Sequence, residues 1–98
     1  METFKDIIHA DKPVLVDFYA DWCGPCKAMN PVIKEVAAAV AGKARVIKVD
    51  IDKSREASEA FQVQAVPTFI IFKNGNIVWR HSGMIDKNSL LNLLNKNS

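Results

Sequence analysis

The segment VLVDFYADWCGPC, residues 14–26, contains the two signals around which the rest of the sequence can be interpreted. Its first seven residues are almost all apolar and are rich in β-branched and aromatic side chains, which predicts a strand buried on both faces. Asp17 is the one charged residue in that run. From about residue 23 to residue 41 the apolar residues recur on one stripe, which predicts a long helix. The segment therefore predicts a buried strand followed at once by a helix that has two cysteines at its start.

The flanking segments extend this unit into a sheet. Residues 45–51 alternate and are β-branched, so they predict a second strand. Strand, helix and strand then form a right-handed βαβ unit with parallel strands. Residues 68–73 and 77–82 predict two further strands joined by the tight hairpin turn Asn74-Gly75.

Three shorter helices complete the predicted fold. They are expected at residues 3–9, at residues 53–61 with Asp52 or Ser54 as a weak cap, and after Asp86 at the C-terminus. The prediction is a single α/β domain over residues 1–98, a three-layer sandwich whose mixed four-stranded sheet has helices on both faces. The expected strand order is 45–51, 14–19, 68–73, 77–82.

Composition excludes several classes of protein. Of the 98 residues, 49% are hydrophobic and 24% charged, which is typical of a folded domain and not of a disordered chain. A net charge of +2 without long like-charge runs gives no footprint for nucleic acid. No apolar stretch is long enough to cross a bilayer, and Glu2, Lys5 and Asp6 interrupt the place where a signal peptide has its apolar core. We expect a cytoplasmic monomer with no membrane partner, unless a leader has been removed from a longer precursor.

The chain has only two cysteines, Cys23 and Cys26. A disulfide across two intervening residues restricts the unfolded chain weakly, so stability does not explain the pair. One helical turn apart, the Cα atoms should lie within the roughly 4.4–6.8 Å that a disulfide requires. The free amides and partial positive charge of the helix start should lower the pKa of Cys23 and make it the nucleophile. Cys26, one turn deeper, should be buried and should resolve the mixed disulfide.

Metal binding is the main chemical alternative for this cysteine pair. Structural zinc takes four ligands, and the two histidines, His9 and His81, lack the spacing of a zinc-binding pair. A zinc site shared between two molecules remains the alternative. The residues favour redox chemistry without a metal. The sequence has no dinucleotide-binding fingerprint, so no cofactor is predicted.

Further residues along the chain extend the pattern around the cysteines: 16–27 (VDFYADWCGPCK), Pro31, Lys48, Val66-Pro67-Thr68, Phe72-Lys73-Asn74-Gly75 and Gly83. With these residues the sequence resembles the thioredoxin family over nearly all of the chain beyond residue 12. The resemblance implies the thioredoxin fold and a protein-disulfide oxidoreductase, an enzyme that reduces disulfides in client proteins and receives electrons from a separate thioredoxin reductase. Family members usually begin with an additional strand, which we expect to be missing here, so that residues 45–51 form an open sheet edge.

Asp17 and Lys48 are candidate catalytic residues through this resemblance. The aspartate that the family has at the position of Asp17 is buried, and its implied role is to move a proton to or from Cys26. Lys48 matches the lysine that partners this aspartate. From the residues alone, Asp17 could instead reach water at a strand end, and Lys48 could be a solvated residue on a sheet edge.

The resemblance also implies a substrate-binding surface beside the cysteines. The Val66–Pro67 bond is expected to be cis, with Pro67 against the sulfurs and the Val66 backbone free to pair with an extended substrate. Trp22 is expected to shield the dithiol and to contribute to an apolar docking surface, although a tryptophan is often simply a core residue. Gly83 and Met84 match a loop on the other side of this surface, where Met84 is bulkier than the small residue often found there.

The residues between the cysteines favour reduction over oxidation. Gly24 and Pro25 are the pair typical of reducing family members, whereas oxidases and isomerases often carry a histidine that makes the disulfide more oxidising. A disulfide oxidase or isomerase in an exported compartment, and a binding module whose dithiol is incidental, remain alternatives. Tyr19, where many relatives have tryptophan, is expected to be a packing change. No role is assigned to His9, Trp79 and His81.

Overall fold

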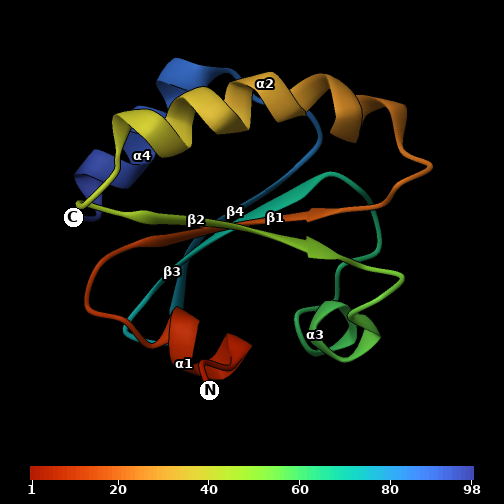
Figure 1. Ribbon diagram of the computed structural model, residues 1–98, viewed down its shortest axis with the longest axis horizontal. Coiled ribbons are helices and arrows are strands. Elements are labelled where there is room, and N and C mark those ends of the chain that lie inside the picture. The colour runs from red at the N-terminus through yellow and green to blue at the C-terminus, as the bar shows by residue number, and fades with distance from the viewer.

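A computed structural model describes residues 1–98, and its elements follow the predicted order. In chain order they are α1 (Phe4–Ile8), β1 (Val14–Tyr19), α2 (Gly24–Ala39), β2 (Arg45–Asp50), α3 (Arg55–Ala60), β3 (Thr68–Lys73), β4 (Asn76–Ser82) and α4 (Lys87–Lys96). The strands form one mixed sheet in the predicted order β2-β1-β3-β4. Helices α2 and α4 cover one face of this sheet, and α1 and α3 cover the other (Figure 1). The predicted three-layer α/β sandwich is confirmed.

Strand β1 lies inside the sheet, as its apolar run predicts. It pairs in parallel with β2 and antiparallel with β3, and all of its residues except Tyr19 are buried. The in-register neighbours of Asp17 are Lys48 on β2 and Phe69 on β3. Because side chains alternate along a strand, Asp17 lies on the same face as Leu15. That is the face that α2 and α4 cover.

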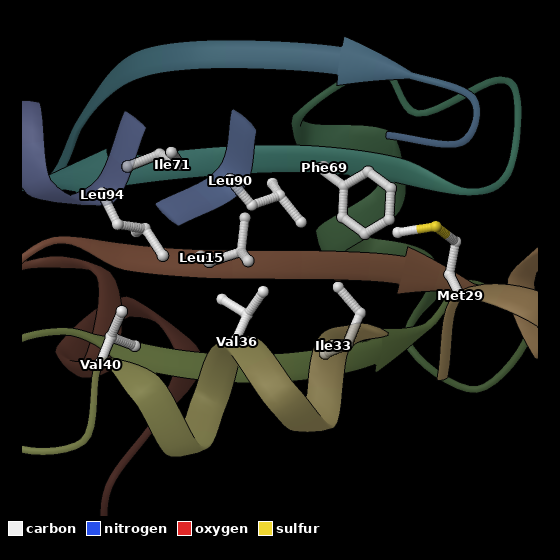
Figure 2. Packing of buried hydrophobic residues seen from close by; sticks show 9 residues of the cluster. All are labelled: Leu15, Met29, Ile33, Val36, Val40, Phe69, Ile71, Leu90 and Leu94. Carbon is white, nitrogen blue, oxygen red and sulfur yellow. The ribbon is translucent and has the colours of Figure 1, made fainter. Parts of the chain in front are cut away.

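The sheet separates two apolar cores. On the α2 and α4 side, residues from both helices meet the side chains of β1 and β3 (Figure 2). Each helix contributes residues spaced three or four apart, so one stripe of each faces the sheet. This cluster comprises Leu15, Met29, Ile33, Val36, Val40, Phe69, Ile71, Leu90 and Leu94. The cluster on the α1 and α3 side comprises Ile8, Val14, Val16, Phe18, Val49, Ile70 and Phe72.

The hairpin between β3 and β4 has the predicted turn. Asn74 and Gly75 both have positive φ, 54° and 82°, as the Asn-Gly pair predicts. The turn is also held from outside, because the Asn74 amide donates to the Ala10 carbonyl at 3.0 Å and the Gly75 amide donates to the Ile8 carbonyl at 2.9 Å. The hairpin tip is therefore attached to the connection between α1 and β1.

Strand β2 forms one edge of the sheet. At this edge the Arg45 guanidinium donates to both carboxylate oxygens of Glu2, at 2.7 and 2.8 Å. This bidentate pair attaches the N-terminal residues to the edge strand. None of the helices is both long enough and apolar enough to cross a membrane.

Helix α3 is shorter than predicted because of a turn that precedes it. The Asp50 carboxylate accepts hydrogen bonds from the amides of Asp52, at 2.9 Å, and Lys53, at 3.4 Å. These bonds hold residues 50–53 in a turn, and the helix begins only at Arg55. Its N-cap is Ser54, one of the two predicted caps, although Ser54 makes no side-chain capping bond; Asp52, the other, is not the cap.

Candidate active site

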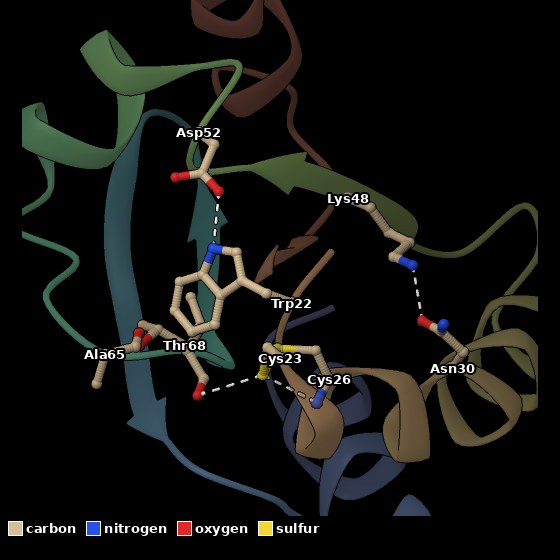
Figure 3. Close-up of a disulfide and its surroundings, with 9 residues drawn as sticks. Trp22, Cys23, Cys26, Asn30, Lys48, Asp52, Ala65 and Thr68 are labelled. Atoms are coloured by element: carbon tan, nitrogen blue, oxygen red, sulfur yellow. Dashed lines mark hydrogen bonds between the residues drawn. A yellow bond between two sulfur atoms is a disulfide. The ribbon is translucent and has the colours of Figure 1, made fainter. Parts of the chain in front are cut away.

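The two cysteines lie where the loop after β1 enters α2. Cys23 is the N-cap of the helix and Cys26 lies in its first turn, with 5.3 Å between their Cα atoms, inside the range expected for a disulfide. The two residues are joined by a disulfide bond (Figure 3). The Cys26 amide donates to Cys23 Sγ at 3.1 Å, so the sulfur takes the place that a serine or threonine oxygen takes at an ordinary N-cap. A thiolate at Cys23 would receive the same bond.

Both cysteines are buried, at 4% and 3% exposed. Burial is expected for Cys26, but sequence reasoning did not foresee it for Cys23. The two residues pack with Ala20 in a small cluster that Ile51 and Val66 partly cover. The disulfide is therefore largely shielded from solvent.

The segment before β3 lies beside Cys23. The Val66–Pro67 bond is cis, as the resemblance implies, and the Val66 carbonyl oxygen lies 3.7 Å from Cys23 Sγ. The Thr68 hydroxyl donates to the Ala65 carbonyl at 2.6 Å, and the Gly83 amide donates to the Pro67 carbonyl at 2.8 Å. The segment at 65–68 is thus fixed both to itself and to the loop after β4.

The loop after β4 presents Gly83 and Met84. Gly83 has a φ of +101°, a conformation that favours glycine, and Met84 is 56% exposed. The His81 ring lies 3.3 Å from the Met84 carbonyl oxygen through Nε2 and stacks on Trp79, with ring centroids 5.8 Å apart. Trp79 and His81, to which the sequence assigns no role, therefore support this loop.

Trp22 lies at the surface and not in the core. Its side chain is 69% exposed, so the interpretation as a core residue is wrong. Its indole nitrogen donates to a carboxylate oxygen of Asp52 at 2.9 Å (Figure 3). Asp52 is a site residue that sequence reasoning missed. The available signal was its position just beyond β2, because the ends of parallel strands such as β1 and β2 meet at one edge of the sheet. Gly24 and Pro25, also exposed, complete the surface around the cysteines.

Asp17 is buried in the middle of β1. It is 1% exposed, so it does not reach water, and its Oδ1 atom has no hydrogen-bond partner. Burial raises the pKa of the Asp17 carboxyl to about 6, although the charge of Lys48 opposes this rise. An unpartnered buried carboxyl with such a pKa can gain or lose a proton near neutral pH.

Lys48 is the in-register neighbour of Asp17 but forms no ion pair with it. The side chain is exposed, as the alternative of a solvated edge residue predicts. Its ammonium donates to Asn30 Oδ1 at 2.7 Å and lies 4.4 Å from the centre of the Tyr19 ring. Tyr19 is thus more than the packing change that we expected, and Asn30 is a neighbour that the sequence did not indicate.

Comparisons with known proteins agree on one family. The thioredoxin family profile matches residues 1–96. The thioredoxin of Rickettsia conorii is 41% identical over 92 residues, which cover 94% of this chain and 88% of that protein. Thioredoxin Y, a chloroplastic protein of Oryza sativa, is 46% identical over 90 residues, 91% of this chain and 54% of its own length. The solved structure of a mutant thioredoxin from Halobacterium salinarum has a TM-score of 0.84 and 35% identity, covering 95% of this chain and 80% of that one.

Proposed function

This chain belongs to the thioredoxin family and is a thiol–disulfide oxidoreductase, and on that premise we propose that it reduces disulfides in other proteins. The observation that carries the proposal is the position of Cys23 at the N-cap of α2, where the Cys26 amide contacts its sulfur at 3.1 Å. A hydrogen bond and a helix start both stabilise a thiolate. In the reduced protein this favours Cys23 as the attacking sulfur.

The reaction proceeds by two exchanges. The Cys23 thiolate attacks one sulfur of a client disulfide, so that a mixed disulfide forms and the second client sulfur leaves as a thiolate. Cys26 then gives up its proton and attacks Cys23 Sγ, which releases the first client sulfur and leaves the Cys23–Cys26 disulfide. Two electrons pass from the protein to the client. Asp17 receives the Cys26 proton, a role supported by its burial, its lack of a partner and its raised pKa.

The client is held by the surface around the cysteines. The Val66 backbone pairs with an extended client segment, a proposal supported by the 3.7 Å between its carbonyl oxygen and Cys23 Sγ. Trp22 and Met84, which are both exposed, provide apolar contact. Pro67 offers no amide to compete for the sulfurs, and Gly83 allows the client backbone to come close.

A separate thioredoxin reductase returns electrons to the disulfide. The proposal rests on the sequence, which has no dinucleotide-binding fingerprint of its own. Gly24 and Pro25, with no histidine between the cysteines, support a reductant over an oxidase. Such a reductant works in a reducing compartment, and we place it in the cytoplasm on that argument.

Insulin reduction with cysteine variants tests the proposed mechanism. Cys23→Ser should reduce insulin no faster than the buffer alone, because it lacks the thiolate at the helix start and the remaining thiol, Cys26, is buried. Cys26→Ser should also stop turnover but should accumulate mixed disulfides on Cys23, which mass spectrometry detects. Substantial turnover by Cys23→Ser would contradict the mechanism.

The reduction potential tests whether the protein acts as a reductant or as an oxidant. Equilibration with a glutathione buffer should give a value clearly more negative than the about −180 mV of protein disulfide isomerase. A value at or above that level would favour the oxidase or isomerase. If alkylation of both thiols leaves client binding and cellular role unchanged, the chain is instead a binding module.

A further inference from the structure

Lys48, the in-register neighbour of Asp17 on β2, forms no ion pair with it. Asp17 and Lys48 are in register on neighbouring parallel strands, so their side chains leave the sheet on the same face. The Asp17 Oδ1 atom nevertheless has no partner, and the two residues form no salt bridge. A lysine chain is long and flexible enough to turn toward its neighbour, so its direction here needs a cause.

Two contacts account for that direction. Asn30, on α2, accepts a hydrogen bond from the Lys48 ammonium at 2.7 Å (Figure 3). The Tyr19 ring, two residues beyond Asp17 on β1, lies beneath the same ammonium, 4.4 Å from its centre. A cation over an aromatic ring and a hydrogen bond from a charged group are both favourable, and together they fix the ammonium at one place. That place is a groove of about 310 Å³ between α2 and β2, lined by Asn30, Ile33, Lys34, Ala37, Val46 and Lys48.

We propose that Asn30 is a positioning residue for proton transfer at Asp17: together with Tyr19 it holds the Lys48 ammonium away from the carboxyl. This inference rests on the proposed role of Asp17 in accepting the Cys26 proton. A direct ion pair with Lys48 would favour the charged carboxylate at all times. Without that pair, the carboxyl can take up a proton when Cys26 ionises and return it later.

Few other charges face Asp17. Lys34, on α2, is exposed and lines the same groove as Lys48. His81 lies two strands away, because it opposes Phe69, the neighbour of Asp17 on β3. Lys48 is the one charged group whose field opposes the rise in the pKa of Asp17. The position of the Lys48 ammonium is therefore the main electrostatic influence on the pKa of Asp17.

Titration of the Asp17 carboxyl by ¹³C NMR tests the proposal. The oxidised protein is used because its cysteines do not titrate. Asn30→Ala should move the Asp17 midpoint down by about 1 pH unit, since the freed ammonium can approach the carboxyl. Tyr19→Phe, which keeps the ring, should leave the midpoint unchanged, and Tyr19→Leu should move it in the same direction as Asn30→Ala.

Lys48→Met supplies the decisive control. The single variant should raise the midpoint, and Asn30→Ala should have no further effect in the Lys48→Met background, because no ammonium remains to be released. An unchanged midpoint in Asn30→Ala, or a shift that persists in the double variant, would overturn the proposal. A thermal melt confirms that each variant is folded.

A second measurement separates this inference from the proposed function. The rate at which a mixed disulfide on Cys23 is resolved is followed against pH in wild type, Asp17→Asn and Asn30→Ala. If Asp17→Asn resolves as fast as wild type, the proposed role of Asp17 fails, yet the NMR titration can still show that Asn30 holds Lys48. If Asp17→Asn is slow but Asn30→Ala has the wild-type pH profile and midpoint, the inference alone fails.

Discussion

The indole nitrogen of Trp22 donates a hydrogen bond to the Asp52 carboxylate at 2.9 Å, although 69% of the Trp22 side chain is exposed. The two residues are 30 positions apart in the chain and meet because parallel strands β1 and β2 end at the same edge of the sheet. A surface tryptophan without such a bond samples several rotamers. The bond to Asp52 therefore fixes an apolar side chain next to Cys23.

Removal of this bond should impair the reaction with proteins more than the chemistry of the disulfide. We expect Asp52→Ala to lower kcat/KM for insulin reduction by about fivefold, the equivalent of one ordinary hydrogen bond of about 1 kcal/mol. Reduction of a small aromatic disulfide, which needs no docking surface, should change little. Asp52→Asn keeps an acceptor oxygen and serves as the matched control. Equal losses for the large and the small substrate would contradict an orienting role for the bond.

Asp17 should lower the stability of the fold at neutral pH. Its pKa is raised from 3.8 to about 6, so the folded state binds the proton more tightly than the unfolded state does. The contribution of Asp17 to the free energy of unfolding is therefore fully present below about pH 4 and is lost as the pH rises through 6. The cost at pH 7 is at most about 3 kcal/mol, from 1.36 kcal/mol for each pKa unit. Asp17→Asn stays neutral at every pH. Its free energy of unfolding relative to wild type, measured by urea denaturation, should therefore increase by most of that amount between pH 4 and pH 7.

The N-cap Asp86 provides a control of opposite sign for this experiment. Hydrogen bonds from Ser89 hold the pKa of the Asp86 carboxyl below its ordinary value. Its contribution is therefore present at neutral pH and is lost on acidification. Asp86→Asn should differ from wild type less at low pH than at pH 7. If Asp17→Asn shows the same pH trend as Asp86→Asn, the raised pKa of Asp17 is wrong.

The hairpin tip packs closely against His9. A Cβ atom on Gly75 would lie 2.5 Å from ring atoms of His9, and Gly75 has a φ of +82°. We expect Gly75→Ala to lower the free energy of unfolding by about 2 to 3 kcal/mol, from left-handed strain and the clash together. His9→Ala should relieve only the clash, leaving about 1 kcal/mol in the double variant. Urea denaturation of wild type, the two single variants and the double variant measures this coupling. If the losses of Gly75→Ala and His9→Ala simply add in the double variant, the His9 ring makes no such contact.

The fold was largely predictable because its strongest signals are local. The continuous apolar run at 14–20, the alternation at 45–51 and the Asn74-Gly75 turn each require a particular backbone, and all three lie in the structure as predicted. The exception is the start of α3, where the Asp50 carboxylate binds two backbone amides ahead of the helix. Aspartate can form a cap or a turn, and the sequence pattern does not distinguish the two.

The site was predictable in its cysteines but not in their surroundings. The spacing of Cys23 and Cys26 fixes their relation within one helical turn. The contacts of Lys48 with Asn30 and Tyr19 join three different elements, and they depend on the direction of one flexible side chain. No periodicity in the sequence indicates that direction.

Two glycines of the proposed client-binding surface should respond differently to the same substitution. Gly83 has a φ of +101° and open space where a Cβ atom would lie, so Gly83→Ala should cost about 1 to 2 kcal/mol of stability from backbone strain alone. Gly24 lies in the first turn of α2, where alanine is the better helix former, but it directly precedes Pro25, whose ring crowds a Cβ atom on a helical neighbour. Because these two effects oppose each other, Gly24→Ala should change stability by less than about 0.5 kcal/mol.

The same pair tests the role of the loop after β4 in client reduction. Because the Gly83 amide donates to the Pro67 carbonyl at 2.8 Å, strain at Gly83 should shift the segment beside Cys23. Insulin reduction by Gly83→Ala should fall at least several-fold at a temperature where the variant is fully folded. If Gly83→Ala is destabilised but keeps the wild-type kcat/KM for insulin, the loop after β4 does not contribute to client binding. The proposed docking surface would then include Trp22 and Val66 but not this loop.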